Sequence, residues 1–232
     1  MNKTDGYGQF CPVAMAAEIV CTRWTPLILR ELVSGSTRFN DLRRGMPRIS
    51  PTLLSKRLKQ LEAAGIVRRL RSSDDDSVEY QLTPAGEELK SVVLNLGFWG
   101  QRWIEAQSSL KNLDPSLLMW DMRRNLDPRP ISPQRCVIQI VYPEQPPAKR
   151  RWWLIVDGGK TDLCKVDPGF DVDLYISTDL RTMTAIWMGL TSVTAEIEAE
   201  RLHATGDNRV RTAMQNWLGL SPFAAEKKRV AR

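Results

Sequence analysis

The stretch RISPTLLSKRLKQLEAAGIVRRL, residues 48–70, combines a helical pattern of leucines with a high density of positive charge. Its leucines recur at the spacing of one face of an α-helix. They are Leu53, Leu54, Leu58 and Leu61. Ser50 before Pro51 is typical of a helix N-terminus, and Gly65 of a helix end. We therefore expect a helix that buries its leucines and exposes a basic face.

The positive charge of the chain is concentrated around this helix. Residues 37–71 contain ten Lys or Arg side chains against Asp41 and Glu62, a net charge of +8, whereas the whole chain of 232 residues carries +6. A local excess of this size indicates a polyanionic partner. The alternative is a helical bundle with a solvated basic face, which only the geometry of the surrounding elements can exclude.

The flanking sequence supplies that geometry. Proline-started or capped helical patterns precede the stretch at residues 11–20, 25–35 and 38–46, with Thr25 as the expected N-cap of the second. Two short strands follow, at residues 66–70 and 78–82, on either side of a turn rich in Ser and Asp. A long helix with a wide apolar stripe then begins after Thr83. Three helices, a basic helix and a hairpin, in this order, predict a winged helix-turn-helix.

Each part of such a domain has a physical task at DNA. Side chains on the exposed side of the basic helix reach base edges in the major groove, whereas arginines of the hairpin follow the phosphates or enter the minor groove. Thr52, Ser55, Lys56 and Lys59 suit the first task, and Arg57 suits a phosphate contact. The complete set of predicted DNA-binding residues is Arg38, Ser50, Pro51, Thr52, Ser55, Lys56, Arg57, Lys59, Arg68, Arg69 and Arg71.

Residues Cys11 to Gly86 also carry a family resemblance. A Cys-Pro pair precedes the first helix, Trp-Thr opens the second, a Phe-x-x-Leu helix follows, and an Ile-Ser pair starts the basic helix. That helix ends in LKQLEAAG, and the second strand leads out through YQLTPAG. This segment resembles the HxlR family of bacterial transcription regulators, relatives of the MarR type. One departure is Thr22-Arg23, where the family commonly has a Gly-Lys or similar pair, and we expect no consequence for DNA binding.

The resemblance implies a homodimer that binds double-stranded operator DNA, with the terminal helices at the dimer interface. The helix that contains Trp99 and Trp103 is the candidate for that interface. Some family members use an N-terminal cysteine to sense oxidants or aldehydes, and Cys11 occupies that place. A redox or electrophile switch at Cys11 is therefore the alternative to ligand sensing. A reactive cysteine needs exposure and a lowered pKa, which sequence does not reveal.

The second half of the chain changes its pattern. Short β-branched or aromatic runs at residues 136–142, 151–157, 161–167 and 172–178 alternate with turn residues, and helical patterns follow at 180–190, 192–200 and 208–220. We expect an α+β fold with helices on one side of a largely antiparallel sheet. The predicted domains are a winged helix-turn-helix and dimerisation domain (1–110), a helical linker (111–133) and a ligand-binding domain (134–232).

The segment from Phe170 to Phe223 resembles the sterol-carrier-protein-like fold. In that fold a strand leads into a helix of the type DLRTMTAIWMG, then a second short helix, a strand, a Gly-Asp turn and a last helix. The resemblance implies a tunnel for an apolar small molecule between sheet and helices. The predicted ligand-binding residues are Trp152, Trp153, Leu174, Met183, Trp187, Met188 and Trp217. The same residue types at this spacing are also what a solid core requires, and the sequence leaves both readings open.

Other classes of function fit the composition poorly. His203 is the only histidine and the four cysteines are scattered, so we expect no metal, no cofactor and no His-dependent catalysis. The acids of the second half, Asp157, Asp162, Asp167, Asp171 and Asp173, lie at turn positions rather than in a catalytic pair. A lipid carrier without DNA binding does not explain the +8 segment. The absence of a signal-like or membrane-spanning run predicts a cytoplasmic protein without membrane contact.

Overall fold

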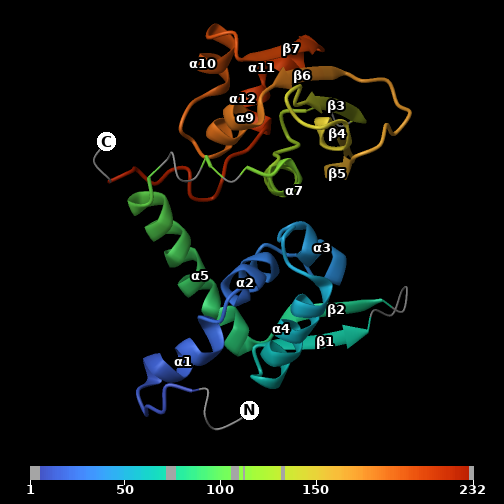
Figure 1. Ribbon diagram of the computed structural model, residues 1–232. Helices are drawn as coiled ribbons and strands as arrows, with labels where there is room; N and C mark the ends of the chain where they lie inside the picture. The colour runs from blue at the N-terminus through green and yellow to red at the C-terminus, as the bar shows by residue number, and fades with distance from the viewer. Residues whose placement is uncertain (1–5, 72–76, 106–109, 112, 132–133, 230–232) are drawn as a thin grey trace. The chain divides into compact units, whose positions relative to one another are not determined.

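The computed structural model describes residues 6–71, 77–105, 110–111, 113–131 and 134–229 (Figure 1). Contacts within the chain divide it into two compact units, Met1–Gly97 and Phe98–Arg232. The boundary falls inside one helix, α5 (Pro84–Trp103). We call the two parts the N-terminal unit and the C-terminal unit. The predicted functional domains, with limits at 110 and 133, stay a prediction.

The described residues of the N-terminal unit form four helices, a hairpin and the first part of α5. The elements before α5 are α1 (Pro12–Val20), α2 (Thr25–Val33), α3 (Phe39–Arg44), α4 (Pro51–Ala63), β1 (Val67–Arg71) and β2 (Val78–Leu82). The two strands pair antiparallel, with Val67 opposite Leu82 and Arg71 opposite Val78. The helices bury one apolar cluster, to which Ile28, Leu42 and Leu58 belong. This order of elements confirms the predicted winged helix-turn-helix.

Two predicted positions in this unit, a helix N-cap and the start of a strand, differ from the structure by one residue. Thr25 is the first residue of α2, and the residue before it, Trp24, occupies the N-cap position with φ of +78°. A bulky residue in the left-handed region is held there by its surroundings, because local preference disfavours it. The first strand begins at Val67 rather than Ile66. The Ser- and Asp-rich turn predicted between the strands lies largely outside the described residues.

The C-terminal unit is a mixed five-stranded sheet with helices. Its strands are β3 (Cys136–Val141), β4 (Arg151–Asp157), β5 (Lys160–Cys164), β6 (Leu174–Thr178) and β7 (Leu202–Gly206), in the order β5-β4-β3-β6-β7. The helices are α7 (Pro115–Asn125), α8 (Pro147–Arg150), α9 (Leu180–Trp187), α10 (Val193–Glu198), α11 (Asn208–Thr212) and α12 (Met214–Trp217). The α+β class is therefore confirmed.

Three of the four strand pairings are antiparallel, as expected of a largely antiparallel sheet, whereas β3 and β6 pair in parallel at its centre. The chain crosses from the edge strand β5 to β6, and such a crossover connection is what parallel neighbours require. The helix expected over 208–220 is also divided into α11 and α12, because Ala213 has φ −84° and ψ 3°, outside helical values, between them.

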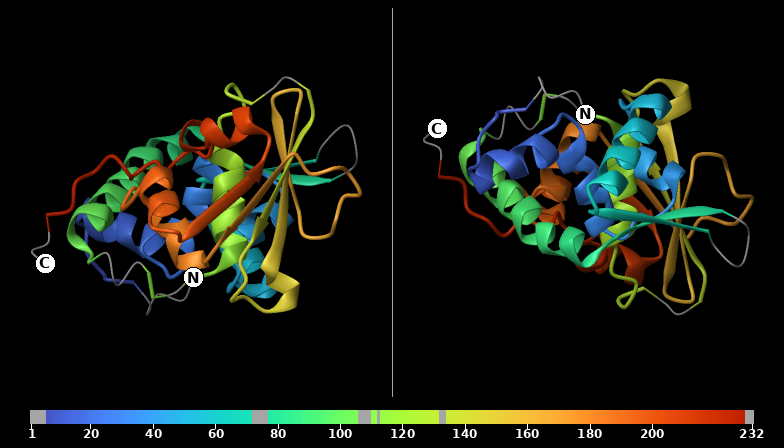
Figure 2. Two further views of the ribbon diagram at one scale, coloured as in Figure 1. Left: turned by 90° about the horizontal axis from the view of Figure 1, so that it is seen from above. Right: turned by 90° about the horizontal axis from the view of Figure 1, so that it is seen from below.

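Helices and sheet enclose one apolar core on a single face of this sheet. Figure 2 gives two further views, in which α7 and α9 lie on the same side of the strands. Ile138, Trp152, Leu154 and Ile176 point from the strands into the core. Leu118, Met119 and Met122 enter it from α7, within the segment predicted as linker. The core of the C-terminal unit therefore includes α7.

Candidate nucleic-acid interface

The basic helix α4 is fixed at its start and along its buried side. Ser50 is its N-cap, and the hydroxyl oxygen accepts a hydrogen bond of 3.2 Å from the N–H of Leu53. Leu54, Leu58 and Leu61 are almost completely buried in the core of the N-terminal unit. The leucines thus hold α4 on its scaffold, as their periodicity predicts, and leave the other side of the helix free to face solvent.

The exposed side of α4 presents the residues predicted to read base edges. Thr52, Lys56 and Lys59 are exposed, and Ser55 is half-buried. Their spacing of three and four residues places all four on one face, opposite the leucines. Hydroxyl and ammonium groups on one exposed helical face can donate to base and phosphate acceptors. The structure therefore brings these four residues together, and their contact with DNA stays a prediction.

Arg57 lies at the edge of that face and has partners within the unit. Its Nε donates a hydrogen bond of 3.2 Å to the carbonyl oxygen of Arg23, and its Nη1 donates to Oε1 of Gln60 at 2.7 Å. Arg23 precedes Trp24, the residue with positive φ. The side chain of Arg57 thus ties α4 to the turn between α1 and α2.

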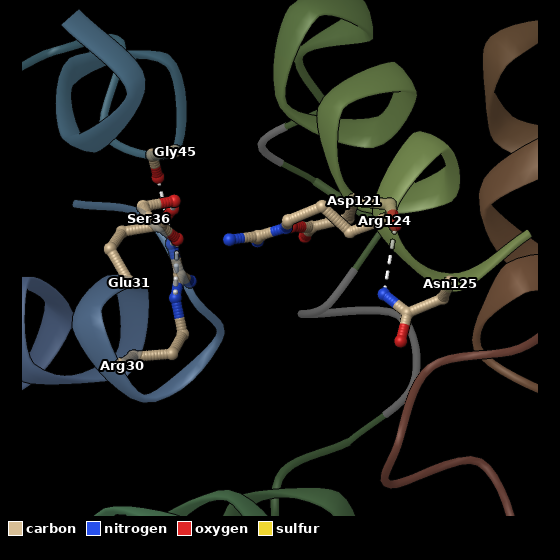
Figure 3. A network of polar contacts seen from close by, with 7 residues as sticks. All are labelled: Arg30, Glu31, Ser36, Gly45, Asp121, Arg124 and Asn125. Atoms are coloured by element: carbon tan, nitrogen blue, oxygen red, sulfur yellow. Dashed lines mark hydrogen bonds and ion pairs between the residues drawn. The ribbon is translucent and has the colours of Figure 1, made fainter. Parts of the chain in front are cut away.

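A buried carboxylate organises the turn that leads toward α4. Glu31, in α2, is 0% exposed, and its Oε1 accepts a hydrogen bond of 2.7 Å from Nη2 of Arg30. The same guanidinium nitrogen donates to the carbonyl oxygen of Gly45 at 2.7 Å, and the hydroxyl of Ser36 donates to Oε2 of Glu31 at 3.3 Å. Figure 3 shows these four residues. A Cβ on Gly45 would lie 2.0 Å from Cδ of Glu31, so any other residue there would displace the buried carboxylate.

Figure 3 also shows a second polar cluster, which belongs to α7 in the C-terminal unit. The guanidinium of Arg124 pairs with the carboxylate of Asp121, one turn earlier in the helix. The side-chain amide of Asn125 donates a hydrogen bond of 2.8 Å to the carbonyl oxygen of Asp121. These contacts run along a single helix and so stabilise α7 itself.

The hairpin places its arginines on two faces. Arg69 and Arg71 lie opposite Tyr80 and Val78 in the register, on one face. Arg68 lies opposite Gln81 on the other face, and its Nη2 donates a hydrogen bond of 3.0 Å to Oε1 of that residue. All three arginines are exposed. The hairpin therefore carries positive charge on both sides, and its contact with DNA stays a prediction.

The remaining predicted DNA-binding residues lie at the starts of helices. Arg38 precedes α3 and is exposed, with its Nε 3.8 Å from Oε1 of Glu79. Pro51 is exposed at the first position of α4. Ser50 is exposed too, but its hydroxyl oxygen already accepts the capping hydrogen bond.

Cys11, the candidate redox residue, precedes the first turn of α1. Its thiol makes no side-chain hydrogen bond that caps the helix. The N–H groups of Ala14 and Val13, at the start of the helix, nevertheless favour the thiolate and lower the pKa of Cys11 below that of a free thiol. Cys136 has the opposite environment, because burial and the negative charges of Asp173 and Asp207 raise the pKa of its thiol to about 12.

The predicted ligand-binding residues separate into two groups. Six of them lie in or against the apolar core between sheet and helices: Trp152, Leu174, Met183, Trp187, Met188 and Trp217. Trp153 is buried but points to the opposite face of the sheet, because neighbouring residues of a strand alternate. Its Nε1 has no hydrogen-bond partner among the described residues. The structure thus does not bring Trp153 together with the other six.

The aspartates of the second half serve the backbone and nearby arginines. The carboxylate of Asp173 accepts a hydrogen bond of 2.7 Å from the N–H of Val137, and Asp157 pairs with Arg135 at 3.0 Å. Within the described residues, no group of three or more His, Cys, Asp or Glu side chains could hold a metal ion. None of the helices in the described part of the chain is both long and apolar enough to cross a membrane.

Sequence reasoning missed two features of the N-terminal unit. The Arg30–Glu31–Gly45 network had a signal, because Glu31 lies next to the apolar positions Leu29 and Leu32 of the α2 pattern. A charged residue that faces a core needs partners. The hydrogen bond from Arg57 to the carbonyl of Arg23 had no signal in the sequence, since it joins residues 34 positions apart.

Comparisons with known proteins agree with this geometry. The family model for HxlR-like helix-turn-helix proteins matches residues 19–108. YvaP of Bacillus subtilis, an uncharacterized HTH-type transcriptional regulator, is 34% identical over 107 residues, which are 45% of this chain and 95% of YvaP. Rv3095 of Mycobacterium tuberculosis, another uncharacterized HTH-type transcriptional regulator, is 44% identical over 95 residues, which are 40% of this chain and 58% of that protein.

Two solved structures also resemble part of the chain. The redox regulator HypR in its reduced form is 34% identical, covers 39% of this chain and 91% of HypR, and has a TM-score of 0.37. The reduced form of the transcriptional regulator YodB from Bacillus subtilis is 33% identical, covers 40% of this chain and 93% of YodB, and has a TM-score of 0.36. The assignment depends on the sequence matches: this chain belongs to the HxlR family of helix-turn-helix transcriptional regulators.

Proposed function

We propose that the protein is a sequence-specific DNA-binding regulator that binds a roughly palindromic operator as a homodimer and acts as a repressor. In each copy α4 lies in the major groove, where Thr52, Ser55, Lys56 and Lys59 read the bases. Arg68, Arg69 and Arg71 contact the backbone or the minor groove beside it. The observation that carries the proposal is that α4 exposes a polar and basic face while its other face is buried in the core.

Two exposed apolar surfaces support the homodimer. Helix α1 has no buried residue, and exposed apolar side chains lie on it and just before it, including Phe10, which is 97% exposed, and Val13. Along α5, Val92, Leu96, Trp99 and Trp103 are exposed at the spacing of one helical stripe. Exposed apolar surface of this kind marks an interaction site. A second copy of the chain covers both surfaces in the proposed dimer.

The test is to select DNA from a random-sequence pool with the full-length protein and to map the protected bases. The proposal predicts two protected half-sites related by dyad symmetry, separated by about one helical turn or a multiple of it. It also predicts a dimer in light scattering of the unbound protein, and a monomer for Trp103→Glu. Protection without sequence preference, or protection of a single half-site, would contradict it.

The C-terminal unit is proposed to be sterol-carrier-like and to sense an apolar small molecule. The resemblance leads from a strand through a helix, a second short helix and another strand to a Gly-Asp turn and a last helix. β6, α9, α10, β7, Gly206-Asp207 and α11 follow one another in that order. Since Met183 and Trp217 are fully buried in the core, a ligand would enter by parting α9 or α12 from the sheet.

A dansylated fatty acid is a suitable first probe of that unit. The proposal predicts saturable binding with one site per chain, weakened by Met183→Phe, which fills the core side of the sheet. Ile155→Phe is the matched control, because Ile155 points to the opposite face. Non-saturable uptake, or equal effects of both substitutions, would remove the apolar site between sheet and helices.

Switching through Cys11 is the second candidate function, and the lowered pKa of that thiol favours it. In this reading an oxidant or electrophile modifies the thiolate next to α1, and the C-terminal unit has only a structural role. The change would act on the dimer, because α1 belongs to the proposed dimer surface. Loss of oxidant-dependent release of DNA in Cys11→Ser, but not in Cys21→Ser, would support this function.

A further inference from the structure

The segment Ser221–Arg229 lies along the end of α5. The ring of Phe223 meets that of Phe98 edge to face, with centroids 5.3 Å apart and an interplanar angle of 87°. One turn of α5 later, Nε of Arg102 lies 3.3 Å from Oε2 of Glu226. All of these residues belong to the C-terminal unit. The segment is thus joined to α5 by an aromatic pair and an ion pair.

The same segment supplies donors to carbonyl groups at the end of α5. The last carbonyl groups of a helix have no partner within the helix. The N–H of Arg229 donates a hydrogen bond of 2.9 Å to the carbonyl oxygen of Arg102. Nζ of Lys228 donates one of 2.6 Å to that of Ile104, and a cation at this position also favours the negative end of the helix dipole. Residues more than 120 positions away therefore cap α5.

At its other end the segment is attached to the end of α9. The N–H of Ser221 donates a hydrogen bond of 2.8 Å to the carbonyl oxygen of Trp187. Gly189 has φ of +69°, and a Cβ there would lie 2.9 Å from Cβ of Ala224, so these two segments of the chain are in contact. Nε2 of Gln101, in α5, donates to the carbonyl oxygen of Met188 at 3.4 Å. Helix α9, which contributes Met183 and Trp187 to the core, is thus joined to α5 directly and through the segment.

We propose that Ser221–Arg229 is a clasp that connects the core of the C-terminal unit to the proposed dimer helix. With the clasp closed, the last turns of α5 are capped and held against the end of α9, and Trp99 and Trp103 are presented in a fixed arrangement. A displacement of α9 opens the clasp and frays these turns. The dimer and its binding to DNA are then weakened. The first step, the capping of α5 by the clasp, does not depend on the proposed function. The second step, the weakening of the dimer and of DNA binding, does.

The first step is tested by hydrogen exchange on the full chain. Lys228→Ala removes the donor to Ile104 and Phe223→Ala removes the aromatic pair. The matched controls are Lys227→Ala and Pro222→Ala, because both residues are exposed neighbours in the same segment. We expect the amides of residues 99–104 to exchange about tenfold faster in the double variant Phe223→Ala/Lys228→Ala. We expect unchanged exchange in the control pair, and in β3 of the double variant.

Unchanged exchange at residues 99–104, or an equal increase in the control pair, would overturn the clasp. Unfolding of the C-terminal unit is recognised by faster exchange in β3, its central strand, as well, and Glu226→Gln then gives a milder opening of the same contact. The second step predicts a larger dimer dissociation constant in light scattering and weaker DNA binding for the double variant than for its control. Faster exchange without either change would overturn the coupling, and wild-type protein that binds no DNA would refute the proposed function while leaving the clasp decided by exchange.

Discussion

The side chain of Arg57 donates a hydrogen bond of 3.2 Å to the carbonyl oxygen of Arg23 and so connects α4 to the turn before α2. That turn contains Trp24, whose φ is +78°. The conformation costs free energy and persists only where the surrounding structure holds it. Arg57 therefore has a place in the scaffold of the N-terminal unit in addition to the phosphate contact proposed for it.

Arg57→Ala is expected to lower the free energy of unfolding by about 1 kcal/mol, because it removes the bond to the carbonyl of Arg23. Urea unfolding followed by circular dichroism measures the change. Lys59→Ala, on the exposed face of the same helix, should leave stability within about 0.5 kcal/mol of wild type. Unchanged stability of Arg57→Ala, together with a loss of DNA affinity, would show that the side chain acts only at DNA.

Lys56→Ala is expected to weaken binding to the selected operator by about fivefold or more, because it removes a proposed contact of the recognition face. Its stability should equal that of wild type, since the side chain is exposed. Fluorescence anisotropy with labelled operator measures the affinity. Lys90→Ala removes the same charge from an exposed position of α5 and serves as the control. Equal losses of folding and of binding would make Lys56 a structural residue.

Operator affinity is expected to fall steeply with salt, because each neutralised phosphate releases counterions, with a slope of about −0.9 in log K against log salt per phosphate. Replacing Arg68, Arg69 and Arg71 together with Ala removes six arginines from each dimer and should reduce the magnitude of the slope by up to about five. The measurement is an anisotropy titration at several salt concentrations. A slope unaffected by the triple substitution would show that the hairpin arginines do not contact the phosphates.

Ser50→Ala is expected to lower the free energy of unfolding by about 1 kcal/mol, because the N–H of Leu53 loses its acceptor. Thr52→Ala, two residues later and exposed, should change it by less than about 0.5 kcal/mol. Thermal and urea unfolding compare the two variants. If both substitutions had the same effect, the cap would not contribute to the stability of α4.

Alkylation of cysteines by iodoacetamide should separate Cys11 from Cys136 by pH. The lowered pKa of Cys11 increases its thiolate fraction, so its rate should level off at a lower pH than that of a free thiol. The pKa of Cys136 is raised to about 12, and its thiolate is scarce at all lower pH values. Mass spectrometry of peptides after timed alkylation follows both. A Cys11 rate that rises with pH like that of a free thiol would remove the basis for the redox alternative.

Features with a local cause could be predicted from the sequence. The start of α4 followed from Ser50-Pro51 and its buried face from the leucine spacing, because capping and amphipathic burial depend on neighbours along the chain. The separation of Trp152 and Trp153 onto opposite faces of β4 also had a signal, the two-residue period of a strand. The prediction of one ligand site that contains both residues conflicts with that period.

Features with a tertiary cause could not be predicted. Positive φ at Trp24 goes against the local preference of a bulky residue, and only contacts elsewhere in the fold select it. The parallel pairing of β3 with β6 depends on strand order, which periodicity does not contain. The attachment of Phe223 to Phe98 joins positions far apart in the chain. Each depends on which segments meet in the folded protein.

The most direct measurement is a mobility shift of the purified protein on the intergenic DNA upstream of its own gene, with an excess of unrelated competitor DNA. The account predicts a discrete shifted species that survives the competitor, is lost at high salt, and is weakened by Lys56→Ala but not by Lys90→Ala. If no shifted species forms even at low salt, or unrelated DNA removes it completely, the proposal that α4 reads an operator at that site is contradicted.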